Sequence, residues 1–254
     1  EIFLSQLSTL GPMARSPKDL ALLLDVQANH SENKSYVSQS KSFSNFTAQP
    51  RMEGIKIGWL GDWGGTLAFE DELLDLAQNA LNEMSSLGAI IRDLKAPFAM
   101  NDIWTSWCDL RAWQITNGLR EIYEDIEKRK NLKPEAVWEI ENGLSLSGQD
   151  IYNAALKKSN WYNSASELFE KFDLLVLPST QVWPFDLAEI YPVSIKNEKM
   201  DTYHRWMQVT IPAGLVGLPV VNIPIGFGKT GLPAGIQLIG SKGSDGYILS
   251  IAQA

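Results

Sequence analysis

The residues best able to act as nucleophile, base or metal ligand are few in this chain. The 254-residue sequence has two histidines, His30 and His204, and one cysteine, Cys108. This set is too small for a zinc site rich in histidine or cysteine, so no metal is expected. Either histidine could still serve one Ser-His-Asp triad, in which the ring takes a proton from the serine hydroxyl. A lone cysteine on an amphipathic helix is typical of a small core residue, and we predict that role for Cys108.

Two Ser-x-x-Lys matches, at residues 31–34 and 38–41, raise the chemistry of a serine nucleophile with a lysine base. That chemistry needs a lysine desolvated in a cleft, so that its amine can accept a proton. Residues 30–50 are instead rich in Ser, Asn and Gln, which is typical of a surface loop. We interpret both matches as chance.

The run from Gly226 to Gly231 matches the Gly-x-Gly-x-x-Gly pattern of dinucleotide-binding proteins. That pattern holds a pyrophosphate only when a helix follows it, because the helix N-terminus supplies the N–H donors. Here the residues at 232–234 lead into another strand-like run. The pattern therefore predicts a glycine-rich turn between antiparallel strands, and no organic cofactor is expected.

Two segments combine aromatic and polar residues as ligand pockets do. Trp183 lies in a proline-bounded loop after a predicted strand, where α/β folds place functional groups, so it is a pocket wall or a core residue. His204 and Arg205 precede Trp206 at the start of a predicted helix. Structural hydrogen bonding is the leading interpretation of that cluster, and a pocket rim is the alternative. Asp201 or Thr202 could cap the helix.

The elements that must position these groups follow from apolar periodicity and turn residues. Alternation and helical spacing predict strand 55–60, helix 70–86 ending near Gly88, and strand 89–91, which together form a βαβ unit with a partly parallel sheet. Further strands are predicted at 173–178, 220–225 and 235–239. Helices are predicted at 16–28, 101–117, 119–130, 134–143, 148–172, 202–215 and 247–254. Most tryptophans should be core, and we interpret Glu139 and Glu141 as part of a solvated helix face.

Composition excludes several classes of protein. Hydrophobic residues make up 44% of the chain and charged residues 20%, which indicates a folded globular protein rather than a disordered one. The net charge of −8 lacks the basic field that nucleic acids require. The most apolar stretch, 211–227, contains three prolines and predicts a helix, a turn and a strand rather than a membrane span. No secretory signal opens the chain, and a single thiol suits the cytoplasm.

Several segments together resemble the carboxyl-terminal half of the amidase signature family. They are Gly-Pro-Met-Ala-Arg-Ser at 11–16, the strand and loop at 173–180, and the runs Gly217–Phe227 and Gly231–Gly240. The resemblance implies an α/β fold with a mixed sheet flanked by helices. It implies that residues 1–254 are the carboxyl-terminal portion of a single amidase-like domain, present as a partial domain, with a mostly helical segment at 100–172.

The activity that this resemblance implies is hydrolysis of carboxylic amide C–N bonds. Such enzymes use a serine nucleophile, a second serine in a cis peptide and a lysine base, without metal or cofactor, and backbone N–H groups stabilise the oxyanion. The glycine- and serine-rich run that carries the nucleophile does not occur here, so we expect no catalytic residue in this chain. The family's pocket role for the loop after Leu177 leads us to expect substrate contacts from Thr180, Gln181 and Trp183. We expect a further contact from Trp206, beside the possible pocket rim at His204 and Arg205.

Two alternatives stay open beside an amidase that acts on a small amide. One is a non-catalytic scaffold or binding protein that kept the fold without the chemistry. The other is the amidase subunit of a tRNA amidotransferase, whose partner subunits would supply the nucleic-acid contact. We expect a piece of a longer cytoplasmic protein, with no membrane contact and no direct nucleic-acid contact. Its exposed sheet edge would be covered by the missing amino-terminal half or by a homo-oligomer partner.

Overall fold

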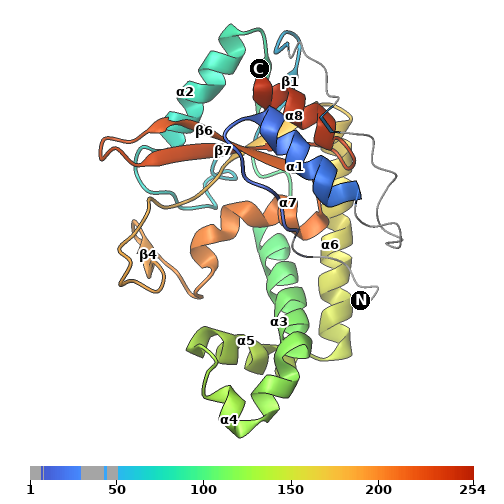
Figure 1. The fold of residues 1–254 in the computed structure, drawn as a ribbon, viewed down its shortest axis with the longest axis vertical. Helices are drawn as coiled ribbons and strands as arrows, with labels where there is room; N and C mark the ends of the chain where they lie inside the picture. The colour runs from blue at the N-terminus through green and yellow to red at the C-terminus, as the bar shows by residue number, and fades with distance from the viewer. Residues whose placement is uncertain (1–6, 8, 30–42, 45–50) are drawn as a thin grey trace.

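A computed structural model describes residues 7, 9–29, 43–44 and 51–254; His30 and the two Ser-x-x-Lys matches lie outside this part of the chain. A five-stranded mixed sheet, in the order β2-β1-β3-β7-β6, carries the packed helices (Figure 1). Its strands are β1 Lys56–Trp59, β2 Ile90–Asp93, β3 Leu174–Pro178, β6 Val220–Phe227 and β7 Pro233–Ile239. The helices are α1 Pro17–Asn29, α2 Leu73–Ser86, α3 Met100–Glu124, α4 Ile126–Arg129, α5 Pro134–Ser145, α6 Gly148–Phe169, α7 Ile211–Val216 and α8 Asp245–Gln253. The predicted α/β fold is confirmed.

The first three strands of the sheet run parallel. β1 pairs with β2 from Lys56 opposite Ile90, and with β3 from Ile57 opposite Leu174. This arrangement confirms the predicted βαβ unit. β7 is antiparallel to β3, and β6 is antiparallel to β7, so β6 points the same way as β3.

The predicted hairpin turn joins β6 to β7. The Gly228 N–H donates to the carbonyl of Leu232 at 2.9 Å, and the Gly231 N–H donates to that of Gly228 at 2.9 Å. Gly231 has φ +76°, a conformation that glycine adopts without strain. No helix follows, so the glycine pattern at 226–231 makes a turn.

Both faces of the sheet are buried, because successive side chains of a strand point to opposite sides. On β3, Leu174 and Val176 pack toward α1, α2 and α8, whose buried residues Ala21, Leu81 and Ile248 belong to the same cluster. Leu175 and Leu177 belong instead to the cluster on α3, α6 and α7. All five residues of β3 are buried, as expected for the middle strand of a covered sheet.

The predicted helical segment at 100–172 consists of α3 to α6. Helix α3 continues through residues 117–119, where two helices were predicted, because its packing against α5 and α6 outweighs the local sequence signal. Helix α6 begins with a capping box, in which Ser147 and Asp150 bond to each other's backbone N–H groups. Among the described residues, no helix combines the length and apolar character needed to cross a membrane.

Tryptophan side chains build much of the core on the α3–α6 side. Trp63 and Trp161 are 0% and 1% exposed, and their rings meet edge to face at 5.5 Å. Each indole N–H is bonded to a backbone carbonyl, Trp63 to Phe98 at 2.8 Å and Trp161 to Pro212 at 2.7 Å. Trp138 differs, since 42% of its surface is exposed.

Two predicted helices have other boundaries in the structure, and one hairpin was not predicted. Helix α2 begins at Leu73 rather than Glu70, because Glu72 has φ 73° and breaks the helical path. The helix predicted at 202–215 is a 3₁₀ segment, η1 Arg205–Thr210, followed by α7. Pro212 lacks an N–H and fits only the first turn, so the α-helix starts at Ile211. A short hairpin, β4 Ser194–Ile195 and β5 Glu198–Lys199, was not predicted.

Candidate functional site

The candidate site lies where the parallel strands end. The carboxyl ends of β1, β2 and β3 point to one edge of the sheet, and the hairpin that follows β6 points the same way. In open α/β sheets this edge is where ligands bind. The loops at 60–72, 94–99 and 179–184 and the turn at 228–232 therefore make the surface of interest.

Gln181 ties the loops at 60–72 and 179–184 to η1. Its side-chain Nε2 donates to the carbonyl of Ala68 at 2.8 Å, and its Oε1 accepts from the N–H of Val209 at 3.0 Å. Its own carbonyl accepts from the N–H of Glu70 at 2.9 Å. Since Gln181 is 2% exposed, the structure places this predicted substrate contact behind the loop surface, where it holds the loop in place.

Trp183 is held between the loop after β1 and the β6–β7 turn. Its backbone N–H donates to the Glu70 carboxylate at 2.6 Å, and its indole N–H donates to the carbonyl of Asp71 at 3.0 Å. The ring lies flush against Gly228, where a Cβ atom would come within 2.7 Å of it. Trp183 is half-buried, so one part of the ring is fixed and the rest faces outward.

The turn at 228–232 is anchored by an ion pair beside Trp183. The Glu72 carboxylate accepts from the backbone N–H of Lys229 at 3.0 Å and meets its Nζ at 3.0 Å. These contacts with Lys229 lower the pKa of Glu72. Glu72, in its left-handed conformation, thus joins the start of α2 to the hairpin.

Thr180 and Ser179 follow directly on β3. The Thr180 hydroxyl bonds within its own turn, donating to the carbonyl of Val182 at 2.9 Å and accepting from its N–H at 3.2 Å. The Ser179 hydroxyl donates to the Asn222 side-chain oxygen on β6 at 2.9 Å. Sequence reasoning missed this Ser179–Asn222 pair because the two residues meet only through β7, which lies between their strands.

A buried glutamine behind the edge was also missed. Gln237 on β7 is 3% exposed, and its Nε2 donates to the carbonyls of Pro178 at 2.8 Å and Val209 at 3.2 Å. It fixes the end of β3 against η1. The sequence did indicate this role, because Gln237 is a polar residue within an otherwise apolar strand. A buried amide in such a strand needs hydrogen-bond partners.

Trp206 reaches the same loop through a small apolar cluster. It packs with Val182, Ile195 and Met200, and its ring meets that of Phe185 edge to face at 5.4 Å. Its indole N–H donates to the carbonyl of Tyr203 at 2.9 Å. The structure therefore brings Trp206 and the loop of Thr180, Gln181 and Trp183 into one neighbourhood.

His204 is enclosed by aromatic rings. It is 3% exposed and lies 4.9 Å from the ring of Trp107 and 5.2 Å from that of Trp104. Burial, and then the nearby Arg111, lowers the pKa of His204 to about 4. Its Nδ1 bonds to the hydroxyl of Thr202 at 2.8 Å. The neutral ring serves packing and hydrogen bonding, and it is a weak base at neutral pH.

The predicted caps at the start of this segment were wrong. His204 is the N-cap of η1, and no side chain caps it. Asp201 instead forms a two-point ion pair with Arg205, at 2.8 and 2.7 Å, and Thr202 bonds to His204. Both side chains are thus bonded to other side chains and do not reach the helix N–H groups.

Glu139 was wrongly predicted to lie on a solvated face. It is 2% exposed, and its Oε1 lies 2.7 Å from Nε of Arg111. Tyr203 donates its hydroxyl to the other carboxylate oxygen, and Arg111 donates to that hydroxyl at 3.1 Å. Burial and the bond to Glu139 raise the pKa of Tyr203. This network links α3 and α5 to the segment that leads into η1.

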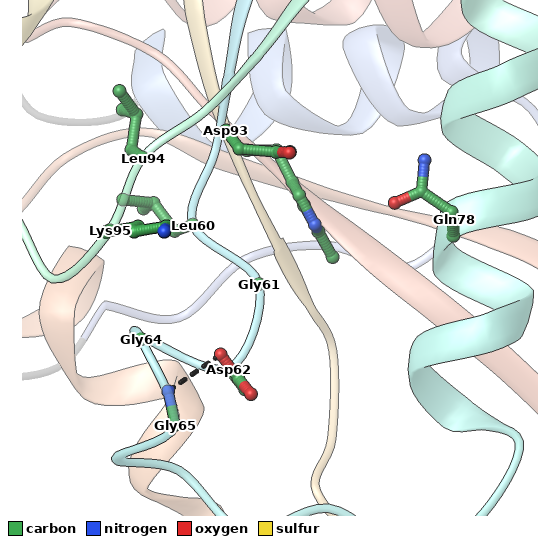
Figure 2. Close-up of a pocket in the computed structure, with 10 residues that line it drawn as sticks. Leu60, Gly61, Asp62, Gly64, Gly65, Gln78, Asp93, Leu94 and Lys95 are labelled. Carbon is green, nitrogen blue, oxygen red and sulfur yellow. Dashed lines mark hydrogen bonds between the residues drawn. The ribbon is translucent and has the colours of Figure 1, made fainter.

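A hollow of about 420 Å³ opens at the carboxyl ends of β1 and β2. Figure 2 shows Gln78 on α2 facing the end of β2, with the glycine-rich loop after β1 along one side. The backbone N–H of Gly65 donates to the Asp62 carboxylate at 2.9 Å, which fixes that loop. Asp93 and Lys95 also line the hollow, so its wall carries charges of both signs.

Comparison of nearly the whole sequence with models of known families identifies the family of this chain. A model of the amidase family matches residues 3–249. The chain belongs to the amidase family. Curated relatives include a glutamyl-tRNA(Gln) amidotransferase subunit of Protochlamydia amoebophila, 30% identical over 98% of this chain and 53% of its own length. The corresponding protein of Alkaliphilus metalliredigens is 24% identical over 98% of this chain and 54% of its own length.

Solved amidase-family structures share the fold. A bacterial aryl acylamidase of the amidase signature family matches with a TM-score of 0.85 at 24% identity, over 96% of this chain and 51% of that one. 6-Aminohexanoate cyclic dimer hydrolase matches with a TM-score of 0.75 at 19% identity, over 94% of this chain and 52% of that one. The chain spans about half the length of the relatives it matches.

Several side chains of this amidase-family chain that could act as a base or nucleophile are engaged in other bonds. The histidine described, His204, pairs with a threonine, and the hydroxyls of Ser106 and Ser179 donate to a carbonyl and an amide oxygen. Burial raises the pKa of the Cys108 thiol to about 12, so the protonated form dominates at neutral pH. Within the same part of the chain, no three His, Cys, Asp or Glu side chains converge to hold a metal ion.

Proposed function

We propose that this chain is the carboxyl-terminal, substrate-facing portion of a single-domain enzyme that hydrolyses linear carboxylic amides. The observation that carries the proposal is the family match over residues 3–249. In such a reaction a serine hydroxyl attacks the amide carbonyl, the amine leaves, and water releases the acyl group. Fixed N–H donors stabilise the oxyanion. The nucleophile and its base belong to a part of the protein outside this chain.

This chain contributes the wall against which the amide is oriented. The exposed Ser179–Asn222 hydrogen bond supplies polar groups, and Trp183 and Trp206 supply aromatic surface. Gln181 and Gln237 hold that surface from behind. A rigid wall speeds the reaction because it holds the carbonyl in the attacking geometry.

The helices α3 to α6 shape substrate choice in this proposal. Their contact with the site runs through Arg111, Glu139 and Tyr203 to the segment that carries Trp206. The test is to graft residues 100–172 into a related full-length amidase. A changed ratio of kcat/KM between two amides supports the proposal, and an unchanged ratio contradicts it.

A small amide is favoured over aminoacyl-tRNA as the substrate. The curated relatives named above are glutamyl-tRNA(Gln) amidotransferase subunits, which favours the tRNA alternative. However, the net charge of −8 disfavours direct tRNA contact. The aryl acylamidase and the Thermotoga maritima member of that group of subunits, with TM-scores of 0.85 and 0.61, both share the fold, and this likeness does not separate the two substrates.

Two assays separate these substrates. The chain is joined to the half of the aryl acylamidase that it does not cover, and aniline release from an anilide is measured. The same protein is then mixed with the partner subunits of a tRNA amidotransferase, and glutamine-dependent amidation is measured. Anilide hydrolysis alone supports the small-amide proposal, whereas amidation alone supports the tRNA alternative. Turnover in neither assay by a folded joined protein supports a non-catalytic scaffold.

Cytoplasmic location is part of the same proposal. The thiol of Cys108 is unpaired and suits a reducing compartment. Cell fractionation tests the cytoplasmic location. Cells express the protein in its natural reading frame, and the chain is then detected in each fraction.

A further inference from the structure

A second, smaller cavity lies away from the sheet edge, between α3, α5 and the segment before η1. Its volume is about 200 Å³, which suits a molecule of a few heavy atoms. Its wall includes Asp109 and Ala112 from helix α3, Trp138, Glu139 and Asn142 from helix α5, and His204. Cys108, Ser145 and Leu146 also line it. These residues belong neither to the loops of the candidate site at the sheet edge nor to the hollow of Figure 2.

The polar groups in this cavity are mostly acceptors. Two carboxylates, Asp109 and Glu139, and the side-chain amide of Asn142 line it, and none of the described lining residues is a lysine or an arginine. A ligand that donates several hydrogen bonds and carries positive charge fits such a wall.

The two carboxylates differ in their partners. Glu139 is neutralised by Arg111, whose Nε lies 2.7 Å away and whose guanidinium stacks 5.2 Å from the centre of the Trp107 ring. Asp109 makes no ion pair with any residue that the structure describes. Lys157 attracts the Asp109 carboxylate through space, but it is itself paired with Asp102 at 3.2 Å. Burial raises the pKa of Asp109, which means that its negative charge is poorly solvated there. The cavity therefore carries one unbalanced negative charge.

The aromatic walls favour a cation as well. Trp138 faces His204 at 6.0 Å and an angle of 70°, and the Trp107 ring lies 4.9 Å behind His204. Aromatic faces attract ammonium groups, and the attraction strengthens where water is excluded. Since the pKa of His204 is lowered to about 4, the ring is neutral at pH 7 and does not repel a cation.

We propose that this cavity binds a small primary alkylammonium ion. The three N–H donors of such a head group match the carboxylates of Asp109 and Glu139 and the amide oxygen of Asn142. Its short alkyl chain lies against Trp138 and Ala112. The proposal does not depend on amide hydrolysis, because it concerns a binding site that this chain forms by itself.

The test is titration of the 254-residue chain with n-propylammonium chloride at constant ionic strength, followed by NMR of the tryptophan indole N–H signals. The Trp138 signal is assigned from W138F. We expect saturable movement of that signal with a Kd on the order of 1 mM. Equal concentrations of n-propanol, which has the same tail without the charge, should move it little.

Asp109→Asn keeps the shape of the side chain and removes the charge, and it should weaken binding about tenfold. Glu121→Gln is the matched control, because Glu121 is exposed on the same helix and does not line the cavity. Should D109N lose its cooperative melt, Asn142→Leu gives the same comparison by removing an acceptor. No saturable shift, equal response to n-propanol, or unchanged affinity in the folded variant would overturn the proposal.

Discussion

The carboxylate of Glu139 lies 2.7 Å from the guanidinium of Arg111, and Glu139 is 2% exposed. The pair joins α5 to α3, and Tyr203 extends it toward the candidate site. Removing one partner of a buried pair leaves the other charge without compensation, which costs about 3–5 kcal/mol when both groups are fully buried.

We predict that Glu139→Ala lowers the free energy of unfolding by about 2–4 kcal/mol, less than a fully buried pair would lose. The discount applies because the Arg111 side chain is 34% exposed and can reach water. Urea denaturation measures the change. Glu141→Ala, on the exposed side of α5, is the control and should shift the value by about 0.5 kcal/mol or less. Equal losses in the two variants would place Glu139 on the solvated face after all.

Gln181→Ala should destabilise the loop after β3. The substitution leaves the carbonyl of Ala68 and the N–H of Val209 without their partner, at about 1–3 kcal/mol for each buried group. The free energy of unfolding and the rate of proteolysis between residues 179 and 184 both report the effect. Gln149→Ala on the exposed start of α6 is the control. A Gln181 variant as stable as this control would contradict the role of the side chain as a tie.

Most of the sheet and its connections could be predicted from the sequence, because each depends on local patterns. A strand is indicated by alternation in Ile55–Leu60 and another by the continuous apolar residues in Leu174–Leu177. A turn is indicated by the glycines at 226–231. The site contacts could not be predicted in this way. Trp183 meets residues from the loop after β1 and from the hairpin turn, and Ser179 meets Asn222 across β7. Such pairs exist only once the strands are in register.

The burial of Glu139 shows a second limit of sequence reasoning. On a helix, a glutamate among other charged residues is typical of a solvated face. What buries it is Arg111 on another helix together with a tyrosine from beyond β5. The tertiary contacts therefore override the local pattern.

Cys108 should resist modification in the folded chain. Its pKa, raised from 9.0 to about 12 by burial, leaves almost no thiolate at neutral pH. We expect the reaction with a disulfide reagent at pH 8 to be at least about 100-fold slower in buffer than in urea, which restores the ordinary pKa. The raised pKa also means that stability is held below pH 9 and falls as pH rises toward 12. Comparable rates in buffer and urea would show that the thiol is accessible.

Protonation of His204 should weaken the fold in acid. Its folded pKa is about 4, below the ordinary value of 6.5, so the unfolded chain binds the proton first. Stability is therefore full above pH 6.5 and falls as pH drops toward 4, by an amount on the order of 3 kcal/mol. The free energy of unfolding is measured from pH 7 to pH 4 for the original chain and for the His204→Phe variant. The difference between the two isolates the effect of His204. A difference that does not change over this range would contradict the lowered pKa.

The outer face of α1 should make the isolated chain self-associate. Leu22 and Leu23 are 51% and 44% exposed on one helix, and β6 is an edge strand of the sheet. We predict concentration-dependent oligomers in sedimentation, reduced in the double variant Leu22→Lys, Leu23→Glu. A monomer at all concentrations, with a cooperative melt, would show that neither surface needs a partner.

Amide hydrolysis is the most direct test of the proposed function. Aniline release from an anilide is measured for the 254-residue chain alone and for the chain joined to the uncovered half of the aryl acylamidase, with a serine-reactive phosphonate as a label. We predict no turnover and no labelled serine in the chain alone, and turnover with one labelled serine outside these 254 residues in the joined protein. Hydrolysis by the chain alone with a label on one of its own serines, or no hydrolysis by a joined protein that melts cooperatively, would contradict it.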